Sequence, residues 1–390
     1  MKKFLLVTVL VLGLTLVSGC SELDPTEEDQ TITVEVRDTS EEVLYEETHA
    51  VSGEPENALD ALDETIDLDY TMSEYGAFVK GVAGHYPRES DVSNNYYYRI
   101  LVDDAASDVG IDAIDFVDGM TITFVEATML DDVDRTVDRA IDRFIDQHPS
   151  TYINDEDVQH YVLIALHQLM EHGYVSVDWS DLIESEENLD FGTETIPVAF
   201  KTALYQTVRS LDTSETLSAM ESFQADNHYD AVSQSIGLSV LGSDSEKNVA
   251  LKDYLIDVEP DVIDPDLVGM TYSALGFYRD DEYVSDYVDD MNDYLEEQTD
   301  EDGIVSWGNA NSASTAVVII GLVAQGYDPR EMDVDLIEAL LAYEVEGAFK
   351  WKLSEEEADL AFSTPQAFAA LVSYKLFRDD SENQTFNLFD

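Results

Sequence analysis

The sequence predicts an α+β protein of two successive domains, a small β-rich domain followed by a larger all-helical one. In residues 31–129, short segments alternate apolar and polar residues, which is the period of a half-buried strand. In residues 130–390, apolar residues instead recur every three to four positions, as on one face of a helix. Residues 313–324 are apolar on every face, so we expect this helix to be enclosed by other helices.

The charge of the chain is strongly negative. Asp and Glu total 85 against 19 Lys and Arg in 390 residues, which gives a net charge of −66. Such a surface repels phosphate backbones, so we expect no nucleic-acid partner. The acidic residues are spread along the chain, and dissolved salt would screen their mutual repulsion, so we expect a saline or alkaline habitat. The single cysteine excludes a disulfide within one chain.

The first twenty residues have the pattern of an export signal. A charged start, Met1-Lys-Lys3, precedes a short apolar run over residues 4–17, which is too short to span a membrane as a mature helix. Val17-Ser-Gly-Cys20 resembles the bacterial lipoprotein signal-peptidase box. The resemblance implies cleavage before Cys20, lipidation of that cysteine, and attachment to the outer face of the cell membrane. Residues 21–30 are polar and acidic, as expected of a flexible tether.

The strands of the first domain follow from its apolar alternation. Residues 31–36 alternate apolar and polar side chains, and residues 43–45 continue the pattern after a turn-like segment, which predicts a hairpin. Residues 56–66 place their apolar side chains on one helical face. One helix on a small mixed sheet is the simplest architecture, and we expect a β-grasp-like topology. Further strands are expected at residues 78–82, 96–102 and 120–125.

Four short motifs follow one another along this domain. They are Tyr75-Gly-Ala-Phe-Val79, Tyr97-Tyr98, Asp108-Val-Gly110, and Gly119 before residues 121–124. Their order and spacing resemble the C-terminal β-domain of transcobalamin and intrinsic factor, which also occurs in bacterial surface proteins as a DUF4430-like module. The chain departs from that family where it has Tyr98 in place of Trp, Asp103-Asp104 in place of Asn-Gly, and Met120 in place of Asp.

The second domain reads as about twelve helical segments, alternately amphipathic and more uniformly apolar, which predicts six outer and six inner helices. Residues 134–146 carry one apolar stripe and are expected to form an outer helix. Gly326, with Pro329 shortly after it, is a typical stop for the apolar helix at 313–324. The inner helices are expected to start near Val158, Pro197, Ala231, Leu267, Ala313 and Pro365.

Two stretches of the second domain echo each other. Gly303 to Trp307 and Gly347 to Trp351 share a Gly-x-x-x-Trp pattern, and each is followed by a Ser-Thr entry into an apolar helix. This echo predicts a repeated helical unit. The stretch at 303–330 resembles the repeats of the prenyltransferase and squalene-cyclase superfamily, in particular its secreted bacterial branch. The resemblance implies an α/α toroid over residues 130–390.

The two resemblances together imply a function. Transcobalamin-type carriers join a toroid to this β-domain, in the opposite chain order, and hold cobalamin in the cleft between them. We therefore expect a non-catalytic surface lipoprotein that binds cobalamin or a related corrinoid in the cleft between its two domains and could pass it to a transporter partner. This expectation is an analogy at the level of folds. The alternatives are an adhesion or protein-interaction module, whose β-domain edge could pair with a partner, and an extracellular enzyme on a toroid scaffold.

The expected ligand residues are polar and aromatic side chains at the starts of inner helices, together with aromatic residues of the β-domain. Flat rings suit a planar macrocycle, and amides suit its peripheral carboxamides. His228 and His85, each beside a tyrosine, are candidate cobalt ligands, and no other metal site is expected. The expected ligand residues are Tyr75, Phe78, Tyr97, Tyr98, Tyr229, Asp230, Gln234, Thr271, Tyr272, Trp307, Asn309, Asn311, Thr315, Trp351 and Gln366.

The catalytic patterns of the toroid superfamily are not matched. Its protein prenyltransferases need a zinc-binding cysteine, and the only cysteine here is Cys20 in the predicted signal. The Asp-x-Asp-Asp acid of class II cyclases does not occur. The sequence Asp289-Asp-Met-Asn-Asp293 matches the Asp-Asp-x-x-Asp motif of terpene synthases, but so acidic a chain yields such a match by chance, and we expect it on a solvated helix face. We therefore expect no enzymatic activity and no required cofactor.

Overall fold

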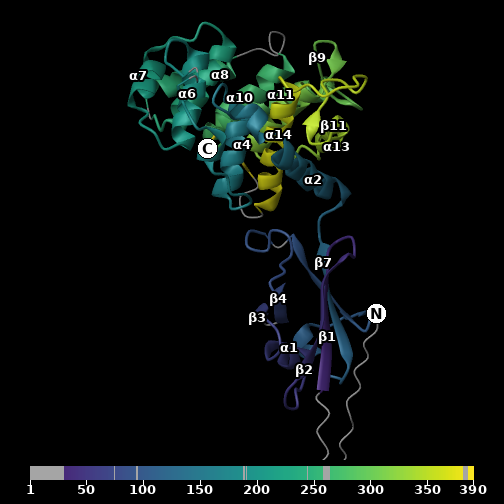
Figure 1. Ribbon diagram of the computed structural model, residues 1–390. Coiled ribbons are helices and arrows are strands. Elements are labelled where there is room, and N and C mark those ends of the chain that lie inside the picture. The colour runs from purple at the N-terminus through teal and green to yellow at the C-terminus, as the bar shows by residue number, and fades with distance from the viewer. Residues whose placement is uncertain are drawn as a thin grey trace, which may run out of the picture. The chain divides into compact units, whose positions relative to one another are not determined.

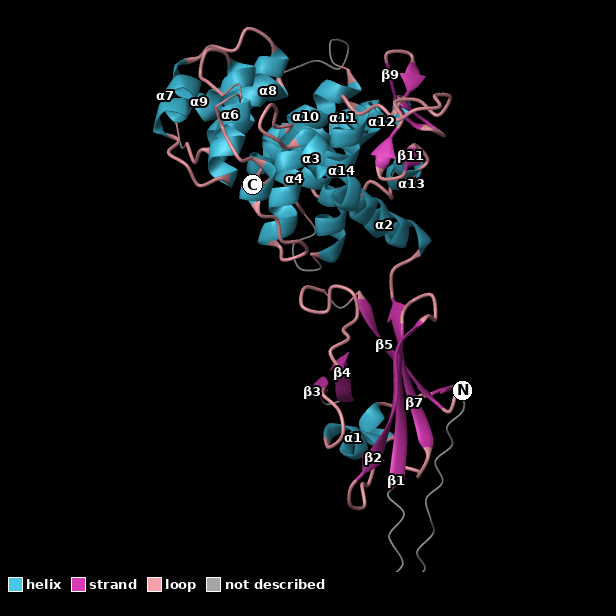
Figure 2. Ribbon diagram, in the orientation of Figure 1, coloured by secondary structure: helices cyan, strands magenta, loops and turns pink. Residues whose placement is uncertain are grey.

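The computed structural model describes residues 30–390 apart from 74, 94, 188, 190, 244, 258–263 and 381–384. The predicted signal peptide with Cys20, and the predicted tether up to residue 29, lie outside the described residues. The protein is a mixed α+β chain, as predicted, and divides into two compact units (Figure 1, Figure 2). The sheet unit holds the residues up to Pro87 and Tyr97–Ala127, and the helical unit holds Arg88–Tyr96 and Thr128–Asp390.

The sheet unit is built on a five-stranded sheet with the strand order β2-β1-β7-β5-β6. The predicted hairpin is confirmed, because β1 and β2 pair antiparallel. β1 also pairs in parallel with β7, so the sheet is mixed, as expected. Ile32, Val34 and Val36 are fully buried, which is the face that the alternation indicated. The strands are β1 (Gln30–Arg37), β2 (Val43–Val51), β5 (Tyr96–Val102), β6 (Ala105–Ala106) and β7 (Met120–Thr128).

One helix and a second hairpin complete the sheet unit. The helix α1 (Ala58–Asp63) is capped by the side chain of Asn57, and its buried leucines join the core formed by the sheet. The strands β3 (Leu68–Ser73) and β4 (Gly76–Val82) pair antiparallel, and Ile111–Ala113 form a short 3₁₀ turn, η1. β3 was not predicted, although its apolar residues do alternate with polar ones.

Six helices in the described part of the helical unit form a closed ring. Each packs against the next one along the chain, and the last packs against the first. Every predicted inner start lies within three residues of one of these helices' first residues. Figure 1 shows the last of them, α14, in yellow. The ring consists of α4 (His160–Glu171), α6 (Ile196–Val208), α8 (His228–Val240), α10 (Pro265–Leu275), α12 (Ser312–Ala324) and α14 (Ser363–Asp379).

The remaining helices follow the predicted alternation only in part. The predicted outer helix at 134–146 is α2, which packs against α14. Between α4 and α6, however, a four-residue helix, α5, stands where a full outer helix was expected. The segment after it is rich in acidic and small polar residues and offers no apolar stripe to bury. These helices are α2 (Asp132–Gln147), α3 (Pro149–Tyr152), α5 (Trp179–Leu182), α7 (Ser214–Ser222), α9 (Glu246–Ile256), η3 (Gly276–Tyr278), α11 (Glu282–Glu297) and α13 (Leu336–Leu341).

The apolar helix α12 is enclosed, as predicted. Its residues are almost all buried, and Gly326 stops it with a positive φ of 82°, which glycine adopts without strain. Its backbone approaches that of α10 closely. A Cβ atom added to Gly321 would lie 2.4 Å from the carbonyl oxygen of Gly269, and one added to Gly269 would lie 2.6 Å from that of Val317. The two helices can pack at this distance only because both positions are glycine.

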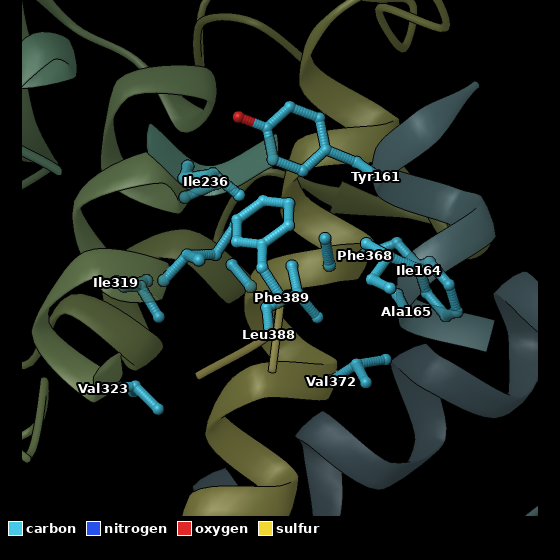
Figure 3. Packing of buried hydrophobic residues seen from close by; sticks show 14 of the residues in the cluster. Tyr161, Ile164, Ala165, Ile236, Ile319, Val323, Phe368, Val372, Leu388 and Phe389 are labelled. Carbon is cyan, nitrogen blue, oxygen red and sulfur yellow. The ribbon is translucent and has the colours of Figure 1, made fainter. Parts of the chain in front are cut away.

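The end of the chain packs inside the helical unit. Leu388 is fully buried and Phe389 is 5% exposed. Figure 3 shows both side chains among residues of several ring helices, including Tyr161, Ile236 and Phe368. The side-chain amide of Gln168 holds this segment by donating to the carbonyl oxygens of Leu388 and Asp390 at 3.0 and 2.8 Å. The segment therefore fills part of the core that the ring encloses.

A buried ion cluster joins α14 to α2. The ammonium group of Lys375 lies 3.0 Å from carboxylate oxygens of Asp138 and Glu89 and 3.3 Å from Asp379. Arg378 lies 3.1 Å from Asp138 and 2.8 Å from Asp379. Lys375 is 2% exposed and Asp138 is fully buried, so solvent screens these charges weakly. Each group of the cluster therefore depends on its partners to remain charged.

The pKa values of the buried carboxyls reflect this dependence. Burial raises the pKa of Asp138, but the charges of Arg378, Lys375 and Arg88 outweigh burial and hold it below its ordinary value. Burial likewise raises the pKa of Asp379, and the hydrogen bond and charge of Arg378 bring it below the ordinary value. Both carboxyls are therefore charged at neutral pH.

Residues 88–96 belong to the helical unit although they interrupt the sheet unit in the sequence. Arg88 lies 2.7 Å from Asp142 on α2. The hydroxyl of Tyr96 donates to Asp138 at 2.9 Å. Together with Glu89, these residues contribute from a distant part of the chain to the cluster around Lys375.

No helix in the described parts of either unit combines the length and the apolar composition that crossing a membrane requires.

The ion cluster predicts a strong response to the loss of Lys375. We expect Lys375→Met to lower the free energy of unfolding by about 3–5 kcal/mol, because it removes one of the cations that compensate the buried carboxylates of Asp138, Glu89 and Asp379. In the unchanged protein, the lowered pKa values of Asp138 and Asp379 add stability that is complete above about pH 4 and is lost as the pH falls through their folded values. Chemical denaturation at several pH values in high salt measures both effects.

The control for this prediction is Asp132→Asn, which removes the exposed ion pair between Asp132 and Arg135. Solvent screens that pair, so this change should have no measurable effect. Equal destabilisation by the two substitutions would show that the buried cluster has no special role.

The close approach of α10 and α12 gives a second prediction. We expect Gly321→Ala to lower the free energy of unfolding by about 1–3 kcal/mol, because the new methyl group meets rigid backbone. Gly237→Ala in α8 is the matched control, since its new methyl group would meet the flexible end of Met220 at 2.3 Å. Thermal unfolding of both variants should show a much larger loss for Gly321→Ala, and a similar loss in both would contradict the argument.

Candidate functional site

An open pocket of about 700 Å³ lies in the helical unit at the starts of α10, α12 and α14. We call it the mouth pocket. The first turns of the three helices and the loops before them supply its walls, which combine aromatic rings, amides and carboxyl groups. Its lining residues are Asp266, Trp307, Asn311, Ala313, Ser314, Trp351, Glu355, Asp359, Phe362 and Gln366.

Two short hairpins position the tryptophans of the pocket. The first, preceding α12, is fixed by a hydrogen bond from the backbone N–H of Ile304 to the hydroxyl of Thr315, at 3.0 Å. The second, preceding α14, is fixed in the same way, from Phe349 to Thr364 at 2.9 Å. The shared geometry supports the predicted repeat. The hairpin strands are β8 (Thr299–Asp300), β9 (Gly303–Ser306), β10 (Asn309–Ala310), β11 (Glu344–Val345) and β12 (Ala348–Phe349).

Trp307 is held in an unfavourable conformation. It lies in the tight turn between β9 and β10, where Ser306 pairs with Asn309, and its φ is +56°. Positive φ is costly for a bulky side chain, and Gly308 beside it has a φ of +80° without that cost. The indole is nevertheless 78% exposed, so little burial compensates for the strain. A strained and exposed tryptophan at the rim of a pocket is a candidate ligand contact.

Trp351 connects the two repeats. Its carbonyl oxygen accepts a hydrogen bond of 3.1 Å from the backbone N–H of Ser312, the first residue of α12. The hydroxyl of Ser312 donates to the carbonyl of Lys350 at 2.6 Å. The ring of Trp351 already carries a cation, because the ammonium group of Lys352 lies 4.0 Å from its centre. This contact is a cation–π interaction.

Asp266 supplies a poorly solvated carboxyl group. It lies in the first turn of α10, and its Oδ1 atom is buried and has no hydrogen-bond partner among the described residues. Burial raises the pKa of Asp266 above its ordinary value; the side chains of Ser314 and Trp307 oppose the rise, and the charge of Asp264 adds to it. The charged form of Asp266 is therefore under-stabilised by its own surroundings.

The other two carboxyl groups of the pocket differ from Asp266. Asp359 is occupied, because its two oxygens accept hydrogen bonds from the backbone N–H groups of Ala361 and Ser363, both at 3.0 Å. It shapes the loop that leads into α14. Glu355 is half-buried and accepts a weak 3.4 Å hydrogen bond from the backbone of Lys352. No Lys, Arg or His is among the described residues that line the pocket.

Four of the expected ligand residues line the mouth pocket: Trp307, Asn311, Trp351 and Gln366. Asn309 lies next to them on β10, and its amide donates to the carbonyl of Trp307 at 3.5 Å. Asn311 also caps α12, because its side-chain oxygen accepts the backbone N–H of Ser314 at 2.9 Å.

Several other expected ligand residues are buried and have structural roles. The amide of Gln234 donates to the carbonyl of Met220 at 2.6 Å, and the hydroxyl of Tyr272 donates to that of Val288 at 2.8 Å. Thr271 and Thr315 are likewise buried, and Thr315 fixes the first hairpin. The prediction placed them at helix starts, but one turn along an enclosed helix is enough to turn a side chain into the core.

The expected residues at the start of α8 lie outside the pocket lining. The hydroxyl of Tyr229 donates to Asp264 at 2.9 Å, and Asp230 accepts a 2.8 Å hydrogen bond from the amide of Asn227. The ring of His228 stacks on Tyr254, with 4.6 Å between the ring centres. These three side chains thus have partners within the helical unit.

The expected residues of the β-domain lie in the sheet unit. Tyr75 is 90% exposed at the tip of the β3–β4 hairpin, and Phe78 is partly exposed on β4. On β5, Tyr97 is half-buried, and Tyr98 packs edge-on against Phe124 with 5.7 Å between ring centres. His85 is a ring neighbour of Tyr45 at 5.9 Å.

No cluster of three or more His, Cys, Asp or Glu side chains suited to a metal ion occurs among the described residues. Asp289, Asp290 and Asp293 are exposed on α11, the solvated location expected for the Asp-Asp-x-x-Asp match.

Four pocket residues, Asp266, Glu355, Asp359 and Phe362, were not predicted from the sequence. Asp266 could have been found, because Asp264-Pro265-Asp266 directly precedes the predicted inner start at Leu267. Phe362 and Asp359 similarly precede the predicted start at Pro365. Glu355 stands in an acidic run, Glu355 to Glu357, in which nothing distinguishes the residue that faces the pocket.

Comparison with known proteins identifies part of the sheet unit. Residues 56–125 match the family described as "Domain of unknown function (DUF4430)", which confirms the predicted DUF4430-like module over that range. No curated protein matches the chain. A crystal structure from Ruminococcus gnavus, described as that of a candidate metal-binding protein, is 16% identical and covers 26% of this chain and 100% of its own, with a TM-score of 0.22. A similarity this low supports no conclusion about fold or ligand.

The strain at Trp307 yields a testable prediction. We expect Trp307→Asn to raise the free energy of unfolding by about 1 kcal/mol, because asparagine tolerates positive φ and the exposed indole loses little burial. Denaturant titration measures the change. A loss of stability of the same size would show that the indole contributes packing, and would remove the argument that its position is retained for binding.

Proposed function

We propose that this chain is a non-catalytic small-molecule-binding protein whose ligand site is the mouth pocket of the helical unit. The observation that carries the proposal is that four of the ligand residues expected from the sequence, Trp307, Asn311, Trp351 and Gln366, line one pocket. Pockets that bind small ligands combine apolar walls with a few polar groups in this way. The helical unit is, in this proposal, an α/α toroid, an assignment supported by the closed ring of helices from α4 to α14.

A cobalamin-like corrinoid is the first ligand to test. The proposal draws this ligand from the resemblance of the two domains to corrinoid carriers. Indole rings can stack on the flat macrocycle, and the amides of Asn311 and Gln366 can pair with its peripheral carboxamides. Only an edge of so large a molecule would enter the mouth pocket.

The proposed location is the outer face of a bacterial cell membrane. The proposal rests on the lipoprotein-like motif that ends at Cys20, whose lipid would anchor the chain through the acidic tether. A binding protein in this position could deliver its ligand to a transporter.

The proposal is tested by titrating residues 21–390 with cyanocobalamin and with cobinamide in high salt. Calorimetry and the visible absorption of the corrinoid report binding. We expect saturable binding tighter than about 1 μM, which corresponds to about −8 kcal/mol. Trp307→Ala should weaken it by about tenfold or more, because it removes an aromatic contact.

The control is Tyr283→Ala, which removes another exposed aromatic side chain, on α11 and outside the pocket lining. It should leave the affinity unchanged. If neither corrinoid binds, the corrinoid assignment is wrong. If corrinoid binds equally well to the Trp307 variant, the ligand site lies elsewhere, and the mouth pocket loses its assigned role.

A further inference from the structure

The mouth pocket is acidic, a property that the site residues predicted from the sequence did not indicate. Asp266 and Glu355 face it together with two indole rings, and no cationic side chain is among its described lining residues. Of the three carboxyl groups, only Asp359 has both oxygens occupied by strong backbone hydrogen bonds. Among its described residues, the pocket lining itself therefore supplies no cation, and the neighbouring ammonium group of Lys352 lies over the ring of Trp351.

Asp266 contributes most to this character. Its Oδ1 atom is buried and accepts no hydrogen bond from the described residues, although the side chains of Ser314 and Trp307 act as hydrogen-bond donors to the carboxyl group. A charge in such surroundings interacts more strongly with a nearby ion than an exposed one does. A cation bound in the mouth pocket would interact favourably with the negative charge of the Asp266 carboxylate.

The aromatic rings favour the same kind of ligand. The ammonium group of Lys352 already lies 4.0 Å from the centre of the Trp351 ring, so this part of the site holds an organic ammonium in the protein itself. Trp307 is 78% exposed and offers a second ring. Tryptophan is the ring that attracts cations most strongly, because of the negative potential over its face.

We propose that the mouth pocket binds an organic ammonium group with an apolar body, which packs against Trp307 and is selected by the carboxylate of Asp266. The inference rests on the proposed function and deepens it by naming the chemical class of the group that enters the pocket. An anionic group is disfavoured because it would face the carboxyl groups of Asp266 and Glu355 in a lining whose described residues include no cation. A neutral group would leave the charge of Asp266 uncompensated.

The experiment compares three probes of one shape and different charge: benzylamine, benzyl alcohol and benzoate. Trp307 and Trp351 are two of the three tryptophans in the chain, so intrinsic fluorescence reports occupancy of the pocket directly. Titrations use residues 21–390 in concentrated KCl, which suppresses the general attraction of a chain of net charge −66 for cations. We expect benzylamine to bind at least tenfold more tightly than benzyl alcohol, and benzoate not to bind.

Two substitutions assign the preference to its residues. Asp266→Asn should remove most of the difference between benzylamine and benzyl alcohol, whereas Trp307→Ala should weaken both. The control is Asp290→Asn on the exposed face of α11, which changes the net charge by the same amount and should leave the preference intact.

Each result has a distinct meaning. Equal binding of benzylamine and benzyl alcohol would overturn the inference and leave the pocket as a ligand site. A charge preference that Asp290→Asn abolishes as fully as Asp266→Asn does would also overturn it, because the attraction would then be general. Binding of a corrinoid without binding of any probe would overturn the ammonium inference alone, while failure of the corrinoids and of all three probes would overturn the proposed function as well.

Discussion

The close contact between α10 and α12 is the constraint on which the helical unit and its pocket depend. Gly269 and Gly321 let the two backbones approach to a distance that any Cβ atom would prevent. Asp266 stands less than one turn before Gly269, and Ser314 lies two turns before Gly321, so the same contact brings the starts of the two helices together. The poorly solvated carboxyl of Asp266 is thus a consequence of backbone packing some distance below the pocket.

The distribution of the few cations follows from a second constraint. The chain has 19 Lys and Arg residues against 85 acidic ones, and several of the cations are committed to internal pairs. Lys375 and Arg378 lie in the buried cluster, and Arg330 pairs with Asp131, Asp134 and Asp335. Cations that are committed to internal ion pairs cannot neutralise carboxyl groups elsewhere, and the described lining of the mouth pocket contains no cation. The same few cations that stabilise the fold are therefore absent from the pocket, which remains acidic.

Local patterns in the sequence predicted the fold better than the site. Apolar periodicity located the six ring helices and the β1–β2 hairpin, because burial of one face or of all faces leaves a mark on neighbouring residues. The echo at Trp307 and Trp351 located one part of the pocket. Asp266 was missed because its importance arises from a neighbour 48 positions away, Ser314, and from a lack of hydrogen-bond partners that no sequence pattern records. Gln234 and Tyr272 were misassigned because a helix start in sequence does not show which way a side chain turns.

The placement of residues 88–96 in the helical unit has a consequence for how the protein reaches its folded state. Glu89 meets Lys375 across a separation of 286 residues, and Tyr96 meets Asp138 only after the last strand of the sheet has been made. Loops of this length close slowly, because the chain must search a large volume before the contact forms. The ribosome will have produced almost the entire protein before the Glu89 pair can form. Until then, Glu89 lacks its partner Lys375, so the buried ion cluster cannot be complete before α14 has been made.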